Sequence, residues 1–305
     1  MVFLSNYLVF KIVLAALGRT DYPVAGDLEL KYDNANKVYL SGGSLDYIDD
    51  FTLWTTIGGE TSSYDSVESL NLDASNEQIL LADDRDTNTQ LGYDAAISGD
   101  YIIGGGPQDD EGGSQAGAAY IFKKNGTSWS QTAKLIVSDA ASNDQAGEFV
   151  NIFGDYAIIG VYTKSSSAGA AYIFKRDTDA ETWTEQEKIT ASDAASNDYF
   201  GNSVSLNGDY AIVGAPYDGS GEGAAYIFIR SGTNWTQQQK ITSSPTATND
   251  EFGLSVDISG DYVISGANGT TTRAGSAYIF KRSGTSWSQQ AKLQASDGAT
   301  GDRFG

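Results

Sequence analysis

The sequence contains neither cysteine nor histidine. Without cysteine the chain has no disulfide bonds, thiolate metal sites or cysteine nucleophiles, and its redox compartment cannot be deduced from cysteine usage. Without histidine it lacks the commonest general base, the commonest transition-metal ligand and any Ser-His-Asp triad. These two absences narrow the chemistry that the chain can carry out.

Basic residues and proline are also scarce. Lysine and arginine number 19 against 40 aspartates and glutamates, so the net charge is -21. Such a charge repels nucleic acid and anionic membranes and favours cations. Only 4 prolines accompany 35 glycines, a ratio typical of many tight turns rather than of a proline-rich linker. The length of 305 residues suits one large or two medium domains.

Three markers recur with one phase over four copies. The string "GDY" begins at Gly99, Gly154, Gly208 and Gly260. The tyrosine of "AYIF" recurs at Tyr120, Tyr172, Tyr226 and Tyr278. A tryptophan follows each of these at Trp129, Trp183, Trp235 and Trp287. A fixed period of this size indicates a propeller, a solenoid or another array of repeats.

One repeat can be divided into four strands. In the third copy, alternating or apolar runs at residues 203–206, 210–215, 224–230 and 235–242 are separated by turn signals such as "NGD". No segment has a sustained helical period. The fold class predicted is therefore all-β, an array of four-stranded antiparallel blades of the propeller type. We expect the tryptophan of each fourth strand to pack against a neighbouring blade, because it repeats in every copy.

The repeat resembles a known family. "FG" at Phe200–Gly201 and "GAP" at Gly214–Pro216 are similar to the FG-GAP repeat of integrin α-subunit propellers and their bacterial relatives. The resemblance covers residues 83 to 305, in repeats at about 91–145, 146–199, 200–251 and 252–303. Rings of that family have seven blades, and the chain stops at "DRFG", the opening of another repeat. An incomplete seven-bladed ring is thus expected, with a smaller ring or an open arc as alternatives.

Residues 1–82 diverge from the repeat. They are interpreted as a degenerate blade whose last strand is "EQILLADD", with a partial lectin-like sheet as the alternative. Residues 1–18 are apolar, but Lys11 interrupts the run and no basic residue precedes it. A signal segment and an ordinary buried element both remain open here.

Calcium is the cofactor to consider. Similar repeats often carry an acidic calcium loop, but here the matching place is a two-residue turn with one aspartate, so the resemblance does not transfer calcium binding. Asp84, Asp86 and Asn88 alternate like half of a calcium loop and are the weak metal candidates. The competing interpretation is that these acids cap turns and keep the surface soluble.

The function predicted is non-enzymatic binding or adhesion, extracellular or at the cell surface, with a protein or carbohydrate as partner. The candidate surface is the set of loops that follow the GAP strands, because these vary over a constant framework. The candidate ligand residues are Asp109, Asp110, Glu111, Tyr217, Asp218, Glu222, Asn268 and Arg273. We expect no nucleic acid partner and no membrane insertion by the repeats. The alternatives are a structural, self-associating surface or coat component and, less favoured, a propeller glycosidase acting through two carboxylates or a tyrosine.

Overall fold

A computed structural model of the chain describes residues 78–84, 89–269 and 273–305, together with four short strands nearer the N-terminus. The chain divides into two compact units, residues 1–79 and 80–305. In the first unit, β1 (Glu29–Tyr32) pairs with β2 (Val38–Ser41), and β3 (Trp54–Ile57) pairs with β4 (Glu60–Ser63), both antiparallel. Residues 1–18, for which a signal segment and a buried element were both left open, lie outside the described residues.

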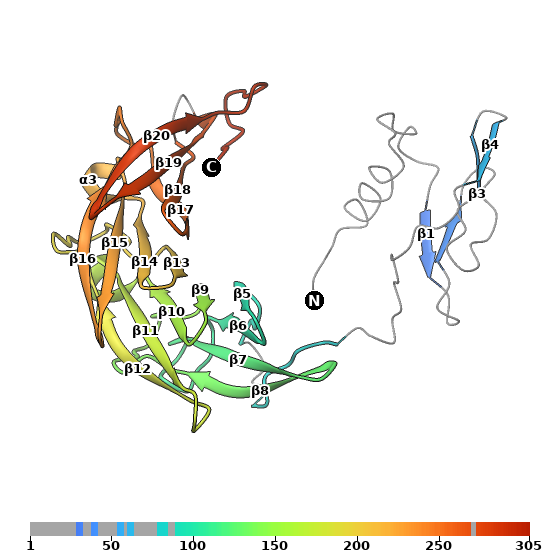
Figure 1. Ribbon diagram of the computed structural model, residues 1–305, viewed down its shortest axis with the longest axis horizontal. Helices are drawn as coiled ribbons and strands as arrows, with labels where there is room; N and C mark the ends of the chain where they lie inside the picture. Colours follow the sequence, from blue (N-terminus) through green and yellow to red (C-terminus); the bar gives the residue numbers. More distant parts are fainter. Residues whose placement is uncertain are drawn as a thin grey trace. The chain divides into compact units, whose positions relative to one another are not determined.

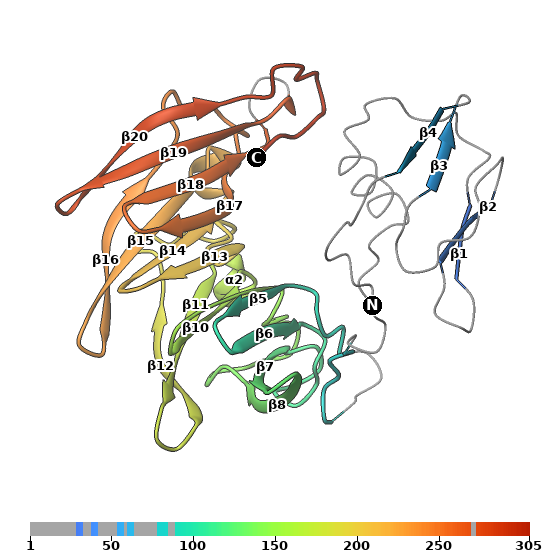
Figure 2. The ribbon, with the colours of Figure 1, turned by 45° about the vertical axis from the view of Figure 1, so that its right-hand side comes forward.

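The second unit consists of four separate four-stranded antiparallel sheets, each with its strands in sequence order. Figures 1 and 2 show these sheets following one another in an arc. We call them blades 1 to 4. Blade 1 is β5 (Ala95–Ser98), β6 (Tyr101–Gly106), β7 (Ala118–Asn125) and β8 (Ser128–Leu135). Blade 2 is β9 (Phe149–Phe153), β10 (Tyr156–Val161), β11 (Ala170–Asp177) and β12 (Thr182–Ile189). Blade 3 is β13 (Ser203–Asn207), β14 (Tyr210–Ala215), β15 (Ala224–Ser231) and β16 (Asn234–Ile241). Blade 4 is β17 (Phe252–Ser259), β18 (Tyr262–Ala267), β19 (Ser276–Ser283) and β20 (Ser286–Leu293).

The all-β, blade-type fold predicted from the repeat is confirmed. In blade 3 the observed strands match the four predicted ones to within a residue or two at each end. Two segments with helical hydrogen bonding, α2 (Lys164–Ser167) and α3 (Asp218–Gly221), are single turns. Their middle residues have left-handed backbone, so both are loop turns between the second and third strands.

Neighbouring blades pack sheet on sheet. Ile158 and Ile173 of blade 2 lie in one buried cluster with Val213, Tyr226 and Phe228 of blade 3. Successive residues of a strand point to opposite faces, and the interior blades have a neighbour on each face. The central strands therefore read as continuous apolar runs instead of alternating ones.

The "FG" and "GAP" strings mark the closest approach between blades. Phe252 forms an isolated parallel bridge with Gly223, and equivalent bridges join Gly117 to Ala146, Gly169 to Phe200 and Gly275 to Phe304. A Cβ atom on Gly214 would lie 1.9 Å from the carbonyl oxygen of Gly253. Glycine is needed at this contact because one backbone lies directly against the next.

Each third and fourth strand pair contains a β-bulge, at Ile227/Phe228 in blade 3. The extra residue there, Gln238, accepts a hydrogen bond of 2.9 Å from the indole of Trp287 in blade 4. Gln186 does the same for Trp235, at 3.2 Å. The bulge thus aims a side chain at the next blade. Packing against a neighbouring blade is confirmed for Trp183, Trp235 and Trp287, whose rings contact Tyr101, Tyr156 and Tyr210 of the preceding blade.

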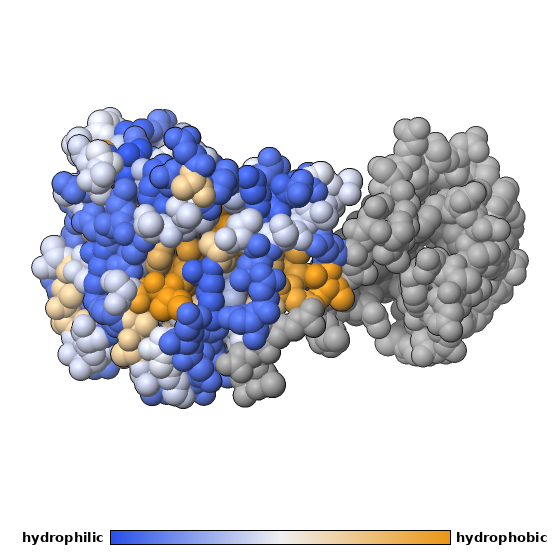
Figure 3. Space-filling model, turned by 90° about the horizontal axis from the view of Figure 1, so that it is seen from below, coloured by the Kyte–Doolittle hydropathy of each residue, from blue (hydrophilic) through white to orange (hydrophobic). Residues whose placement is uncertain are grey.

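One face of blade 4 lacks the cover that its equivalents have. Ile264 is 40% exposed and Leu293 39%, whereas Ile212 and Ile241 at the matching positions of blade 3 are 0% and 3% exposed. Phe304 and Gly305 line a shallow hollow on this face. On the side of the molecule shown in Figure 3, hydrophobic patches interrupt a mostly hydrophilic surface.

Candidate ligand-binding face

The loops predicted to bind a ligand share one end of the blades with the linkers that join one blade to the next. In a four-stranded antiparallel blade, these loops and linkers lie at one end. The two hairpins, which join strand one to strand two and strand three to strand four, lie at the other end. Backbone bonds tie each loop to the following linker, from Asn143 N to Ser114 O (2.9 Å) and from Glu251 N to Gly221 O (3.0 Å). We call this end the loop face. It presents eight or so adjacent loop segments held on rigid sheets, the usual setting for a binding site.

Two of the predicted ligand residues are buried beneath this face. Asp218 accepts a hydrogen bond of 2.6 Å from the hydroxyl of Tyr226 and lies 2.8 Å from the ammonium of Lys240. Asp109 makes the same contacts with Tyr120 (2.6 Å) and Lys134 (2.7 Å). Both carboxylates therefore have internal partners, and their positions serve the packing of the loop.

These contacts form a cluster that recurs from blade to blade. A tyrosine of the third strand and a lysine of the fourth strand meet an aspartate from the preceding linker. The members are Tyr120, Lys134 and Asp84 in blade 1, Tyr172, Lys188 and Asp139 in blade 2, and Tyr226, Lys240 and Asp193 in blade 3. We call these the tyrosine–lysine clusters.

The clusters hold their charges in a fixed pattern. Burial opposes ionisation of Asp139, but hydrogen bonds from Lys188 and Tyr172 outweigh it and lower its pKa to about 2. Burial, aided by the hydrogen bond to Asp218, raises the pKa of Tyr226 well above its usual range. Partial burial lowers the pKa of Lys240, yet the two aspartates more than offset this, so the net shift is upward. In the blade 3 cluster these shifts favour an ionised Asp193–Lys240 pair beside the neutral phenol of Tyr226.

Two copies depart from the pattern. In blade 2, Lys164 occupies the loop position of Asp218, and its ammonium lies 2.5 Å from Asp144. Before blade 4, Pro245 stands where the other linkers carry the cluster aspartate. The hydroxyl of Tyr278 in that blade is buried and has no hydrogen-bond partner among the described residues.

The other predicted ligand residues lie at the surface. Asp110 is exposed and accepts a hydrogen bond of 2.7 Å from the backbone of Gln115, and Glu111 pairs with Lys134 at 2.7 Å. Half-buried or exposed on the loop face are Tyr217, Glu222, Asn268 and Arg273. Arg273 and Tyr217 come close enough for the cation to act on the pKa of the phenol.

The metal candidates are only partly described. Asp84 pairs with Lys134 at 2.5 Å, while Asp86 and Asn88 lie outside the described residues. Within 78–84, 89–269 and 273–305, no group of three or more carboxylates is placed to hold a metal ion. Where Asp84, Asp109 and Glu111 converge, the ammonium of Lys134 already lies between them.

Sequence reasoning missed a row of tyrosines across the loop face. The ring centroids of Tyr162 and Tyr199 are 5.3 Å apart, and those of Tyr199 and Tyr217 are 4.9 Å apart. Burial and the adjacent Glu148 raise the pKa of Tyr162 to about 12. The available signal was the position just before "FG", where Tyr199 replaces the polar Gln145 and Glu251 of neighbouring repeats.

A pocket of about 380 Å³ opens at the end of this row. Its walls come from three loops: the linker before blade 3, the β14–β15 loop and the linker after blade 3. The lining residues are Asn197, Tyr199, Tyr217, Ser220, Gly221 and Asn249. Of the predicted ligand residues, only Tyr217 belongs to it.

A search of known protein families gives a match over most of the repeats. The model of the FG-GAP repeat matches residues 74–122, 129–174, 183–228, 235–280 and 287–305. The chain belongs to the FG-GAP repeat family. No curated protein matches it.

Three of the five FG-GAP matches run from one blade into the next. The match at 183–228, for example, runs from the fourth strand of blade 2 to the third strand of blade 3. The family unit therefore contains one inter-blade contact, one linker and one GAP loop, which together make one segment of the loop face. The first match, at 74–122, includes Leu80 and Ala82, which pack on Tyr120 and Phe122 of blade 1.

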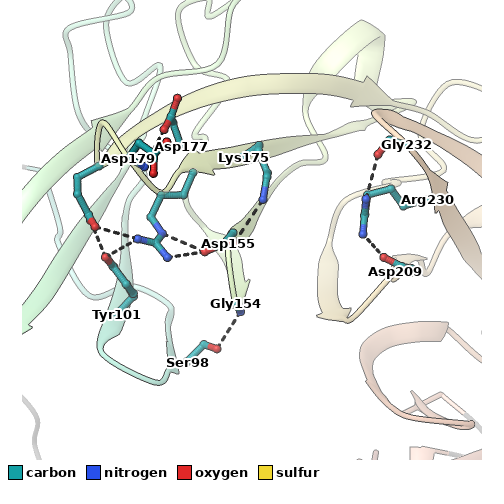
Figure 4. Close-up of polar contacts among 12 residues, drawn as sticks. Ser98, Tyr101, Gly154, Asp155, Lys175, Asp177, Asp179, Asp209, Arg230 and Gly232 are labelled. Carbon is teal, nitrogen blue, oxygen red and sulfur yellow. Dashed lines mark hydrogen bonds and ion pairs between the residues drawn. The ribbon is translucent and has the colours of Figure 1, made fainter.

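The opposite end of the FG-GAP blades is closed by ion pairs. The hairpin aspartates Asp155, Asp209 and Asp261 pair with the arginines of the adjacent third strand, Arg176, Arg230 and Arg282. Figure 4 shows Asp155 facing Lys175, and Arg230 bridging Asp209 to the carbonyl of Gly232. Each of these hairpin aspartates thus has a guanidinium as its partner. No helix in the described part of the chain is long and apolar enough to cross a bilayer.

Proposed function

We propose that the FG-GAP repeats form a non-enzymatic binding module that engages a protein or glycan through the loop face. One observation carries the proposal: the backbone of this face repeats while its side chains do not. The residue immediately before "FG" has φ between 54° and 59° in every copy, yet its identity changes. These residues are Gln90, Gln145, Tyr199, Glu251 and Arg303.

Left-handed backbone at residues other than glycine is costly, so its recurrence shows that the framework imposes it. A constant backbone with varied side chains is what a binding platform requires. The net charge of -21 fits partners other than nucleic acid or anionic membranes. We place the module outside the cell or at its surface, in keeping with a role in recognition.

The proposal includes no catalytic step. The carboxylates beneath the loop face are neutralised by lysines in the tyrosine–lysine clusters, and those at the hairpin end by arginines. A glycosidase pair needs one free acid and one free base facing a cleft. The paired state of these groups favours a structural role for them.

The test is adhesion of beads coated with the full 305-residue chain. The beads are offered surfaces of mucin, collagen, chitin and alginate, which sample protein and glycan ligands. We expect retention on at least one surface, and loss of that retention when Tyr217 and Arg273 are both changed to alanine. The matched control changes Tyr262 and Lys281, an exposed pair on the hairpin side of blade 4. Equal loss in the control would overturn the placement on the loop face.

A structural, self-associating role is the second candidate, and the uncovered face of blade 4 favours it. Ile264 and Leu293 are exposed there, although their equivalents in blades 1 to 3 are covered by the next blade. Sedimentation velocity of the chain across a hundredfold concentration range tests this role. Association that Ile264→Glu abolishes would support it, and a monomer at all concentrations would exclude it.

A further inference from the structure

The pocket between Tyr199 and Tyr217 differs from the corresponding places in the other repeats. Tyr217 stands where blade 2 has Thr163 and blade 4 has Gly269, and Tyr199 stands where the other linkers have Gln, Glu or Arg. The surrounding framework is shared by all copies, so the two tyrosines are not needed to build a blade. Residues that break an internal repeat are the ones expected to form a single site.

The two rings form a right-angled corner. Their centroids are 4.9 Å apart and their planes are inclined at 76°, so one ring presents its face beside the edge of the other. Tyr217 is 41% exposed, which leaves ring surface open to a ligand. An aromatic face of this kind stacks well on the C–H face of a sugar ring.

Uncharged polar groups complete the pocket. The amides of Asn197 and Asn249 and the hydroxyl of Ser220 are exposed, and the structure shows no hydrogen bond from these side chains to the described part of the chain. Amide and hydroxyl groups can each donate and accept, as neighbouring sugar hydroxyls require. No charged side chain lines the pocket. Glu251 and Arg273 lie near enough to Tyr217 to shift its pKa in opposite directions, so the local charges are balanced.

The loops around the pocket are held together by backbone hydrogen bonds. Backbone bonds fix its loops, from Tyr199 N to Ser167 O (2.9 Å), from Tyr217 N to Asp198 O (3.3 Å) and from Gly221 N to Tyr217 O (3.2 Å). Tyr199 has φ of 59°, an uncommon conformation for a bulky residue. The framework imposes this conformation in every copy, so the orientation of the Tyr199 ring is fixed by the backbone around it. Preorganisation lowers the entropy lost on binding.

We propose that this pocket binds an uncharged sugar ring of a glycan. The inference rests on the binding function proposed above and deepens it by naming the class of ligand. A volume of about 380 Å³ lies within the range of small-molecule sites and accommodates one sugar unit with the hydroxyls around it. The exposed tyrosine ring favours a sugar ring with an apolar face, and the amides of Asn197 and Asn249 can form hydrogen bonds with its hydroxyls. A peptide ligand is the competing class, and the experiment distinguishes it.

The experiment is an NMR titration of the full chain with single methyl glycosides. The panel consists of the glucoside, galactoside, mannoside, fucoside and N-acetylglucosaminide, with glucuronate as the charged comparison. We expect at least one neutral glycoside to bind one site with a Kd on the order of 1 mM, a value ordinary for a shallow single-sugar site. Glucuronate should bind at least tenfold more weakly.

Two variants locate the site and a third serves as control. Tyr199→Gly removes one ring and leaves a residue that adopts left-handed backbone readily, and Tyr217→Ala removes the other ring. Each should weaken binding at least tenfold with unchanged thermal unfolding. Tyr262→Ala, on the hairpin side, should leave the affinity unchanged. Binding that persists in both pocket variants, or no binding of any neutral glycoside, would overturn the inference.

The same measurements separate this inference from the proposed function. Suppose that adhesion depends on the loop face, but that no glycoside inhibits it and neither pocket variant reduces it. The binding function then stands, and the result indicates a peptide ligand. Absence of both adhesion and glycoside binding would remove the function together with the inference.

Discussion

Lys240 is expected to stabilise the contact between blades 2 and 3 because it neutralises two carboxylates at once. Its ammonium lies 2.8 Å from Asp193 and 2.8 Å from Asp218. Lys240→Met keeps the apolar stem and removes the charge. Asp218, whose side chain is only 12% exposed, then keeps the hydroxyl of Tyr226 as its one remaining partner in the cluster.

The magnitude follows from the burial of the two groups. Exposed ion pairs contribute about 0–1 kcal/mol, and breaking a fully buried pair costs about 3–5 kcal/mol. Lys240 is 31% exposed, so the pair lies between these limits. We expect the variant to lose about 2–3 kcal/mol at pH 7, or roughly 4–12 °C in Tm for a unit of this size.

The matched control is Arg230→Met, which also removes one positive charge. Its partner, Asp209, is 56% exposed at the hairpin end, so the cost should be about 0–1 kcal/mol. Urea unfolding of both variants, followed by near-ultraviolet circular dichroism, measures the difference. The deficit of Lys240→Met should shrink toward pH 4, because an unpaired buried carboxylate has a raised pKa and its neutral form suits burial. A deficit equal to that of Arg230→Met, or one that grows on acidification, would refute the reasoning.

The wild-type pH profile follows from the same cluster. The pKa of Asp193 is lowered, because its bonds to Lys240 and Tyr226 outweigh burial, so its contribution is present above about pH 4 and is lost as the pH falls further. The pKa of Lys240 is raised, so its contribution is complete below about pH 10 and is lost above its folded pKa. The stability supplied by the cluster should therefore be level from about pH 4 to about pH 10.

Three further outcomes are expected. Gly214→Ala would place a methyl group 1.9 Å from a carbonyl oxygen and should cost at least about 3 kcal/mol in urea unfolding. Gly208→Ala has open space around it but φ of 61°, so it should cost about 1 kcal/mol. Equal losses in the two variants would contradict the close approach of the blades. Tyr278→Phe should raise Tm, because it removes a buried hydroxyl that has no partner among the described residues. Tyr226→Phe should instead cost about 1–3 kcal/mol, and the reverse order would refute the cluster assignment. Carboxyl NMR titration of Asp139 should give a pKa of about 2, and a value near 4 would show that its lysine and tyrosine contacts are not formed in solution.

The fold was readable from the sequence because every level of the repeat agreed. The "NGD" turn, the continuous apolar runs and the periodic tryptophan all indicate the same four strands. The observed strands of blade 3, from β13 (Ser203–Asn207) to β16 (Asn234–Ile241), agree closely with those predicted. The bulge in each fourth strand could not be predicted in the same way. Nothing in "TQQQKI" shows that Gln238 is the extra residue, because the register shift appears only in the pairing with β15 and its purpose only in the contact with Trp287 of the next blade.

The ligand face was predicted in outline only. Placing it at the loops after the GAP strands brought in Tyr217, but Asp109 and Asp218 were selected for charge and prove to be internal partners of lysines. The lysines lie 22 to 25 residues from their aspartates in sequence, so the pairing appears only when the strands are assembled. Tyr199 was missed because its role depends on backbone from three loops that meet only in the folded chain.

The left-handed residue before each "FG" has an evolutionary consequence. In four of the copies the next residue forms an isolated parallel bridge that holds the backbone, so a substitution there alters the surface without redirecting the chain. The five copies already carry four different residue types at this position, from glutamine to arginine. Duplication of a repeat thus adds one more such surface position, and point mutation changes the side chain that the position presents. A designer could diversify these five sites together and expect the scaffold to tolerate most of the resulting variants.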